Sequence, residues 1–311
     1  PHQFGCSQLG ADGENIKKLL CGAACNPNAT FVLFVGLGCE NNTLGGVKAA
    51  MESLRQEGVA YFNCQDVEDE LTYGMEILRD FARQAKDLQR ERVPLSQLCI
   101  GLKCGGSDGY SGLTANPLVG KITDRVVAAG GSAVLTEVPE MFGAEQLLMD
   151  RCVSQEVFEA YRDMILRFKR YYIDNGFPVY ENPSPGNKAG GITTLEEKSL
   201  GCVKKGGSSP IVDVIRYGEQ VKRQGLTTLE GPGNDLISAS ALAAAGCQMV
   251  LFTTGRGTPF STFVPTMKIA TNTPLSQRKE RWIDFNAYTA DADGLYQLVL
   301  KAASGEYHCK S

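Results

Sequence analysis

Short apolar runs alternate with helical spacings in the first half of the chain. Residues 31–35, 59–63, 99–102 and 133–136 are apolar runs that end at glycine or polar positions, which is typical of buried strands. Apolar side chains also recur at intervals of three and four, most clearly in the long helix predicted over 71–88. Strands that alternate with helices predict an α/β fold with a mostly parallel sheet, helices on both faces and a Rossmann-like first half.

The pattern changes near Gly176, where a segment rich in proline, glycine and asparagine begins. Residues 182–191 read NPSPGNKAGG, a composition that predicts neither a helix nor a central strand. The segment is either a linker between domains or a loop that binds a ligand. We therefore expect one α/β lobe over residues 1–178 and a second α/β lobe over residues 179–311. Further strands and an alanine-rich helix are predicted in the second lobe, over 211–215, 237–245, 249–253 and 266–270.

Composition and charge exclude several classes of protein. The 311 residues carry a net charge of −4, so there is no basic field for nucleic acid or an anionic membrane. The apolar runs are far shorter than the roughly 20 residues of a membrane span. Because no secretory leader is recognisable, we expect a cytoplasmic protein whose 11 cysteines stay available for metal binding or chemistry. We expect a small-molecule partner, no nucleic-acid or membrane partner, and a homo-oligomer.

Glycine and polar residues follow the predicted strands at the points where these strands end. Such segments occupy 36–42, 63–66, 103–109, 136–137 and 253–259. In an open α/β sheet the ligand lies beyond the carboxyl ends of the strands, so these segments are expected to share one edge. This convergence favours an enzyme. Lys103, Lys188 and Arg256 each lie in a glycine-rich polar loop, where they are either solvated surface charges or parts of an anion clamp.

Three cysteines lie beside glycines in predicted turns, namely Cys6, Cys39 and Cys104. No CxxC pair occurs, which excludes a zinc ribbon. Three thiolates can hold an iron–sulfur cluster with one open iron, or bind a single Fe²⁺ together with His2. The sequence leaves both alternatives open. The sequence has only two histidines, His2 and His308, and this excludes any mechanism that needs several histidines.

Several motifs are long and unusual in composition. They are GLKCGGSDGYSG at 101–112 with TANP at 114–117, and the segments at 1–8, 35–40, 65–68, 182–191, 208–211 and 253–259. Together they resemble the altronate/galactarate dehydratase family over nearly the whole chain. The resemblance corresponds to the large C-terminal region of that family and implies a small N-terminal substrate-associated domain before Pro1. Tyr110 stands where most relatives are expected to have phenylalanine.

The resemblance implies a hydro-lyase that removes water from a sugar acid to give a 2-keto-3-deoxy acid. The motif around Lys103 resembles the altronate branch, which implies conversion of D-altronate to 2-dehydro-3-deoxy-D-gluconate. The resemblance also implies dependence on Fe²⁺, with Mn²⁺ as an alternative metal. Galactarate dehydration, release of sulfite by a related sulfolactate sulfo-lyase, and a non-catalytic sugar-acid-binding fragment are the alternatives.

This chemistry gives the strand-end residues hypothetical roles. Removal of the proton α to a carboxylate needs a base and a cation that spreads charge, and loss of the β-hydroxyl needs an acid or a metal. The residues expected around the iron are His2, Cys6, Cys39 and Cys104. The expected catalytic residues are Lys103 as base, Asp108 as acid, and Glu137. Substrate binding is expected from Arg256 and Lys188 at the carboxylate, and from Ser107, Ser111, Asn116, Asn187 and Thr254.

Overall fold

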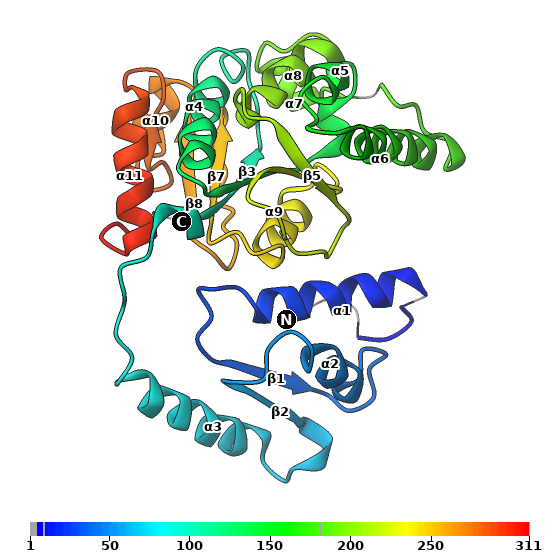
Figure 1. Ribbon diagram of the computed structural model, residues 1–311, viewed down its shortest axis with the longest axis vertical. Helices are drawn as coiled ribbons and strands as arrows, with labels where there is room; N and C mark the ends of the chain where they lie inside the picture. Colours follow the sequence, from blue (N-terminus) through cyan, green and yellow to red (C-terminus); the bar gives the residue numbers. More distant parts are fainter. Residues whose placement is uncertain (1–4, 9, 181, 311) are drawn as a thin grey trace.

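The computed structural model describes residues 5–8, 10–180 and 182–310, which form a small lobe followed by a large lobe (Figure 1). The small lobe contains a two-stranded parallel sheet, in which Val32 pairs with Val59 and Gly36 pairs with Asn63. Its elements are α1 (Ala11–Ala24), β1 (Val32–Gly36), α2 (Leu44–Met51), β2 (Val59–Asn63) and α3 (Glu70–Ala85).

The large lobe is built on a seven-stranded sheet of order β5-β6-β4-β3-β7-β8-β9, in which every pairing is parallel. Its strands are β3 (Cys99–Cys104), β4 (Ser132–Leu135), β5 (Ile211–Ile215), β6 (Gly225–Leu229), β7 (Met249–Thr254), β8 (Thr266–Ala270) and β9 (Phe285–Asn286). The central strand β3 is buried along its whole length. Parallel strands buried on both faces read as nearly continuous apolar runs, so most of them could be predicted from the sequence.

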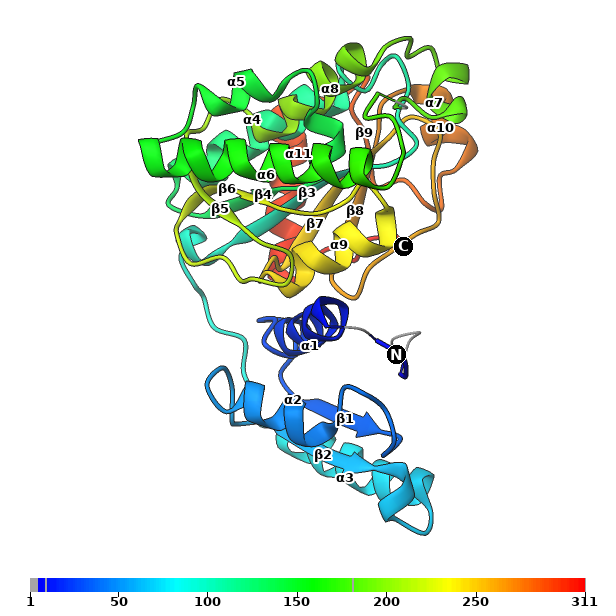
Figure 2. The same cartoon turned by 90° about the vertical axis from the view of Figure 1, so that its right-hand side faces the viewer.

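Helices cover both faces of this sheet, which confirms the predicted α/β fold (Figure 2). On one face, Ile100 and Leu102 of β3 share a core cluster with residues of α4, α6 and α11. On the other face, Phe252 of β7 packs in a cluster with Leu242 of α9. The helices of the large lobe are α4 (Ala115–Ala128), α5 (Glu145–Met149), α6 (Gln155–Asp174), α7 (Pro185–Ala189), α8 (Leu195–Cys202), α9 (Asp235–Ala244), α10 (Thr273–Arg278) and α11 (Ala292–Ser304).

The structure divides the chain at a different position from the predicted boundary between residues 178 and 179. Strands on both sides of that position lie in one sheet, because Val134 of β4 pairs with Thr227 of β6. The two sheets separate instead in the segment between α3 and β3. The predicted Rossmann-like first half is therefore split, with β1 and β2 in one sheet and β3 and β4 in the other.

The prediction that residues 182–191 contain no helix was wrong, because Pro185–Ala189 form the short helix α7. The Ser184 hydroxyl accepts a hydrogen bond from the Asn187 N–H, and Asn187 Oδ1 accepts one from the Ser184 N–H. Proline is tolerated here because an N–H in the first helical turn has no partner within the helix. Asn187 Nδ2 donates to the Ser107 carbonyl at 2.9 Å. The segment therefore lies against the loop that follows β3.

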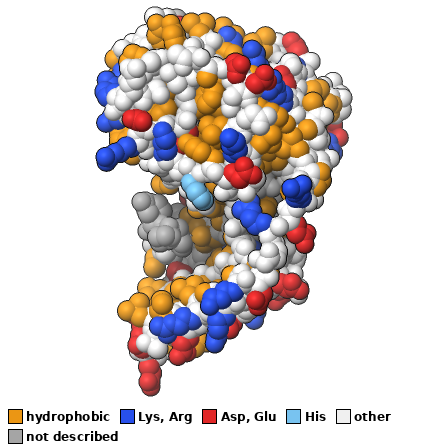
Figure 3. Space-filling view, turned by 90° about the vertical axis from the view of Figure 1, so that its left-hand side faces the viewer, with side chains coloured by type: hydrophobic (Ala, Val, Ile, Leu, Met, Phe, Trp, Pro, Cys, Tyr) orange, Lys and Arg blue, Asp and Glu red, His pale blue; other side chains and the backbone are white. Residues whose placement is uncertain are grey.

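The two lobes meet where α1 packs on α9 (Figure 2). Gly22 allows the close approach, since a Cβ atom there would lie 2.5 Å from the Ala244 carbonyl oxygen. The buried Asn26 Nδ2 donates to the carbonyls of Ala243 at 2.8 Å and Cys247 at 3.0 Å. Figure 3 shows a surface hollowed between the lobes, with cationic and anionic side chains interspersed on this face. Among the helices described, none is both long and apolar enough to cross a membrane.

Candidate active site

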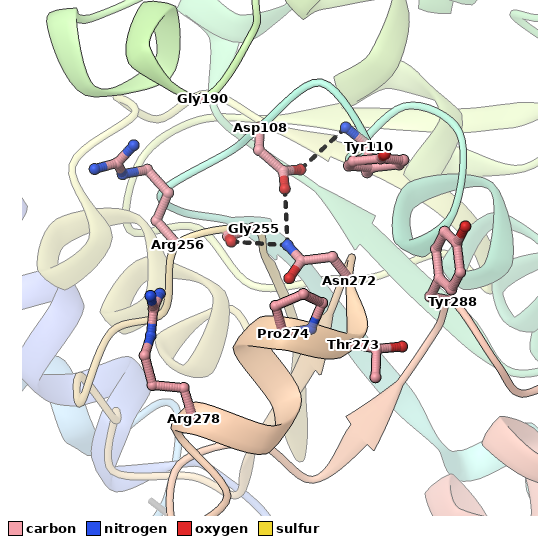
Figure 4. A pocket seen from close by; sticks show the side chains of 10 residues that line it. All are labelled: Asp108, Tyr110, Gly190, Gly255, Arg256, Asn272, Thr273, Pro274, Arg278 and Tyr288. Carbon is pink, nitrogen blue, oxygen red and sulfur yellow. Dashed lines mark hydrogen bonds between the residues drawn. The ribbon is translucent and has the colours of Figure 1, made fainter.

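The carboxyl ends of β3, β7 and β8 surround a cavity of about 650 Å³ (Figure 4). The three strands are adjacent and parallel, so the segments that follow them meet at one edge of the sheet. The volume lies in the usual range of small-molecule sites. The lining residues are Asp108, Tyr110, Gly190, Gly255, Arg256, Asn272, Thr273, Pro274, Arg278 and Tyr288.

Asp108 is a buried carboxylate that joins the loops of this cavity. Asn272 Nδ2 donates both to Asp108 Oδ2 at 2.9 Å and to the Gly255 carbonyl at 3.0 Å. The Asp108 carboxylate accepts hydrogen bonds from neutral donors. They are the Tyr110 N–H at 3.2 Å, the Ser111 hydroxyl at 3.0 Å, the Thr271 hydroxyl at 2.9 Å and Asn272 Nδ2. Its side chain is held in place by three loops, and the carboxylate forms no ion pair with a described residue.

Arg256 and Arg278 are the cations of this cavity, and both side chains are exposed. Figure 4 shows the Arg278 side chain extending from α10 toward Arg256. Tyr110 and Tyr288 lie on the other side, with an edge-to-face contact of 5.9 Å between ring centroids. The cavity thus combines two guanidinium groups with amide, hydroxyl and aromatic groups. That set suits an anion that carries hydroxyl groups.

A buried ionic cluster lies next to this cavity, with Lys103 and Glu137 at its centre. Lys103 Nζ lies 2.5 Å from Glu137 Oε1 and 2.9 Å from Asp235 Oδ1, and it donates to the carbonyls of Cys104 and Gly233. Burial lowers the pKa of Lys103, but the nearby charges of Glu137, Cys104 and Asp235 raise it by more, so its pKa lies above the usual value. The ammonium group therefore keeps its proton, and the geometry gives no support to the predicted role of Lys103 as base.

Glu137 adopts a left-handed backbone conformation, with φ of 71° and ψ of 58°. For a residue other than glycine this conformation costs about 1–2 kcal/mol. Its carboxylate binds both Lys103 and Lys205, and Oε2 accepts the Cys104 N–H at 3.1 Å. Burial raises the pKa of Glu137, and the two ammonium groups more than reverse the effect, so its pKa is lowered. Glu137 thus acts as the fixed counter-charge of the cluster.

Cys104 lies in the same cluster and is buried. Its Sγ atom lies 3.4 Å from Cys202 Sγ and 3.0 Å from Lys205 Nζ. The hydrogen bond from Cys202 and the charge of Lys205 outweigh burial and lower the pKa of Cys104 to about 7. Cys104 also lines a second cavity, of about 340 Å³, which includes Arg256 in its wall. Arg256 is therefore common to both cavities.

The other predicted substrate-binding residues lie at or near the two cavities, with one exception. Ser107 and Asn187 line the second cavity, and Ser111 binds Asp108. Asn116 and Thr254 are fully buried, and their side chains bind protein groups: Asn116 Nδ2 donates to the Gly201 carbonyl, and Thr254 Oγ1 accepts the Gly257 N–H. Lys188 is exposed and lies outside the lining of both cavities.

The four predicted iron ligands do not form one site in the part of the chain that the structure describes. His2 lies outside the described residues. Cys6 and Cys39 are exposed on the small lobe, whereas Cys104 is buried in the large lobe beside the Lys205 ammonium group. No cluster of three or more His, Cys, Asp or Glu side chains that could hold a metal occurs within residues 5–8, 10–180 and 182–310. The three predicted cysteine ligands that the structure describes therefore do not form one iron site.

The sequence pattern did not point to several residues of the cavity and of the ionic cluster, namely Asn272, Thr273, Arg278, Tyr288, Asp235 and Lys205. It also did not point to Lys198, which lines the second cavity and pairs with Glu140. Asn272 and Thr273 directly follow the predicted strand over 266–270, so the strand-end argument could have found them. Arg278 and Tyr288 lie further from that strand end and carry no glycine-rich signal.

Comparison with known proteins gives matches along almost the whole chain. The C-terminal domain of D-galactarate/altronate dehydratase matches residues 95–311, and the second domain of D-galactarate dehydratase/altronate hydrolase matches residues 1–86. Altronate dehydratase of Bacillus subtilis (strain 168) is 58% identical over 314 residues, which cover 98% of this chain and 63% of that protein. Altronate dehydratase of Escherichia coli (strain K12) is 54% identical over 286 residues, which cover 92% of this chain and 58% of that protein.

A more distant relative is the galactarate dehydratase (L-threo-forming) of Escherichia coli (strain K12). It is 35% identical over 301 residues, which cover 90% of this chain and 57% of that protein. This chain thus spans less than two thirds of the length of these relatives. The two domain matches meet between residues 86 and 95, where the two sheets of the structure also separate. These matches confirm the resemblance seen in the motifs, and the chain belongs to the D-galactarate/altronate dehydratase family.

Proposed function

We propose that this chain is the catalytic part of a hydro-lyase that converts D-altronate to 2-dehydro-3-deoxy-D-gluconate. The observation that carries the proposal is the cavity at the ends of β3, β7 and β8, where Arg256 and Asp108 face the same space. Support for altronate comes from the two relatives named altronate dehydratase, at 58% and 54% identity. The 35% identity to galactarate dehydratase makes galactarate the second candidate.

The cavity residues supply what the reaction needs at the substrate. The positive charge of Arg256 stabilises the negative charge that builds up on the substrate carboxylate when the α-proton leaves. Asp108 is the carboxylate that lines the cavity, and we assign it a proton-transfer role; its predicted role as acid stays a prediction. Lys103 and Glu137 are buried beneath the loop after β3 and hold it in position. The Thr273 hydroxyl group can bind a substrate hydroxyl group, whereas the Asn272 amide is used to hold Asp108 and the Gly255 carbonyl.

The test is formation of a 2-keto-3-deoxy acid from D-altronate by protein purified without oxygen and supplied with Fe²⁺ or Mn²⁺. We expect product from D-altronate, less from galactarate and none from the hexitol that lacks the carboxylate. Asp108→Asn serves as the inactive control. Turnover of galactarate but not D-altronate, or release of sulfite from sulfolactate, would move the chain to another branch of the family. Binding of D-altronate without product by any of these preparations would support the non-catalytic alternative.

The remaining expectations stay predictions, namely Fe²⁺ or Mn²⁺ dependence, a cytoplasmic location and a homo-oligomer. Metal analysis of the same preparation separates the two iron alternatives. About one iron per chain without a broad visible band indicates a single Fe²⁺. About four irons with labile sulfide indicate a cluster. Metal-free protein with full turnover would contradict both.

A further inference from the structure

Two arginines line the 650 Å³ cavity, and neither forms an ion pair with a carboxylate that the structure describes. Arg256 follows β7 and Arg278 ends α10; Figure 4 shows the Arg278 side chain extending toward Arg256, whose own guanidinium group is directed away from Arg278. Neither side chain forms a hydrogen bond or an ion pair with a residue that the structure describes. Two like charges that line one cavity repel each other, and an anion bound in that cavity would lessen this repulsion.

The carboxylate of the same cavity does not fill that role. Asp108 takes its hydrogen bonds from Asn272, from two hydroxyl groups and from a backbone N–H, not from either arginine. The position of Asp108 is set by these neutral donors. Both guanidinium groups are therefore left available to a ligand in the cavity.

Lys198, which lines the second cavity, by contrast already has a carboxylate partner. Its Nζ atom lies 2.9 Å from Glu140, and Arg256 is the other cation in the wall of that cavity, beside the carboxylates of Glu140 and Asp235. An incoming carboxylate would have to compete with these contacts. The carboxylate group of a substrate consequently binds best in the first cavity, at the two arginines.

We propose that Arg256 and Arg278 form a clamp for the carboxylate of the substrate, and that Arg278 is a specificity-determining residue for this group. The proposal rests on the proposed function, which supplies a hydroxylated carboxylate as substrate. A guanidinium group binds a carboxylate with two parallel N–H donors, which an ammonium group cannot do. With the carboxylate at the clamp, the hydroxylated carbon chain extends toward Asp108, Asn272 and Thr273, on the side walled by the two tyrosines.

The test measures binding and turnover separately, by calorimetric titration with D-altronate and by steady-state kinetics. We expect Arg278→Gln to raise the Kd of D-altronate at least about tenfold, because a hydrogen bond to a charged group is lost. Arg278→Lys should recover only part of the affinity. The matched control is Arg281→Gln, which removes an exposed arginine outside the cavity lining and should leave the Kd unchanged. The uncharged hexitol should not compete with D-altronate in any of these variants.

Two outcomes would overturn the clamp: an unchanged Kd and KM in Arg278→Gln, or equal binding of the hexitol and D-altronate to the unmodified protein. Failure of the proposed function has a different signature. If the protein binds D-altronate in an Arg278-dependent way but forms no product, the clamp stands and the dehydratase assignment fails. Thermal unfolding of each variant checks that the substitution leaves the fold intact, as expected for an exposed side chain.

Discussion

Gly255 and Asp108 are in contact so close that no other residue can replace the glycine without movement. A Cβ atom on Gly255 would lie 2.1 Å from Asp108 Cγ, and the Gly255 N–H donates to the Gly106 carbonyl at 3.0 Å. The loop after β7 thus rests on the loop after β3. This contact fixes both the carboxylate of Asp108 and the start of the segment that carries Arg256.

Gly255→Ala is therefore expected to push Asp108 out of position. Overpacking of this kind costs about 1–3 kcal/mol of stability, and we expect turnover to fall far more than stability because Asp108 and Arg256 both move. Urea unfolding and steady-state kinetics measure the two effects. The control is Gly45→Ala on α2, where a Cβ atom meets nothing within 4 Å. Full activity in Gly255→Ala would show that the loop contact does not position Asp108.

Lys205→Met tests whether the buried cluster behaves as one ionic unit. Lys205 is 1% exposed and lies 3.0 Å from both Glu137 Oε2 and Cys104 Sγ. Removal of one partner from a buried pair costs about 3–5 kcal/mol, and we expect the lower end because Glu137 keeps Lys103. The adjacent Lys204 is exposed, so Lys204→Met should change the free energy of unfolding by less than about 1 kcal/mol. Equal effects of the two substitutions would contradict a buried ionic cluster.

Asp124 gives a prediction of pH dependence away from the site. Burial raises the pKa of its carboxyl, but hydrogen bonds from Ser209 and Ser208 outweigh burial, so its pKa lies below its usual value. A carboxyl with a lowered pKa in the folded state stabilises the protein above its unfolded-state pKa, and this stability is lost as pH falls through the folded-state pKa. Asp124→Asn should therefore lower the free energy of unfolding by about 1.5–3 kcal/mol at pH 7 and by progressively less below about pH 4.

Urea unfolding of the Asp124 variant and the unmodified protein at several pH values between 7 and 3.5 measures this change. Asp87→Asn is the control, because Asp87 is exposed on the small lobe and should show no such trend. A cost of Asp124→Asn that stays constant over this range would mean that the carboxylate charge does not contribute.

The fold could be predicted from the sequence wherever strands are buried on both faces, because burial there leaves a plain apolar run. β6 shows the limit of this argument, since its sequence GLTTL is fully buried although two of its five residues are threonines. The helix α7 shows another limit. Pro185 and Gly186 argue against a helix by composition, whereas the Ser184 cap makes one short turn possible.

The candidate site could be predicted where residues directly follow a strand, because strand order places them at one edge. Asp108 and Arg256 satisfy this condition. Lys204 and Lys205 show why the rest could not be predicted: the two lysines are neighbours with identical side chains, yet only Lys205 points into the core. Which of the two is buried depends on how the 3₁₀ turn Val203–Gly206 packs against α4, a tertiary contact that local sequence does not encode.

Asn26 is the buried polar side chain at the contact between the lobes, and Asn28 adds an exposed hydrogen bond to the Gln248 carbonyl. Asn26 Nδ2 donates to two backbone carbonyls of the large lobe, those of Ala243 and Cys247. Asn26→Ala leaves both acceptors without this donor in a buried position, which costs about 1–3 kcal/mol. We expect the cost to appear as local opening, so amide hydrogen exchange should become faster in α1 and α9 and stay unchanged in β3, at the centre of the sheet. Asn175→Ala is the matched control, because Asn175 donates only to the Tyr171 carbonyl at the exposed end of its own helix. Faster exchange throughout the large lobe would contradict local opening and would show that the lobes unfold as one unit.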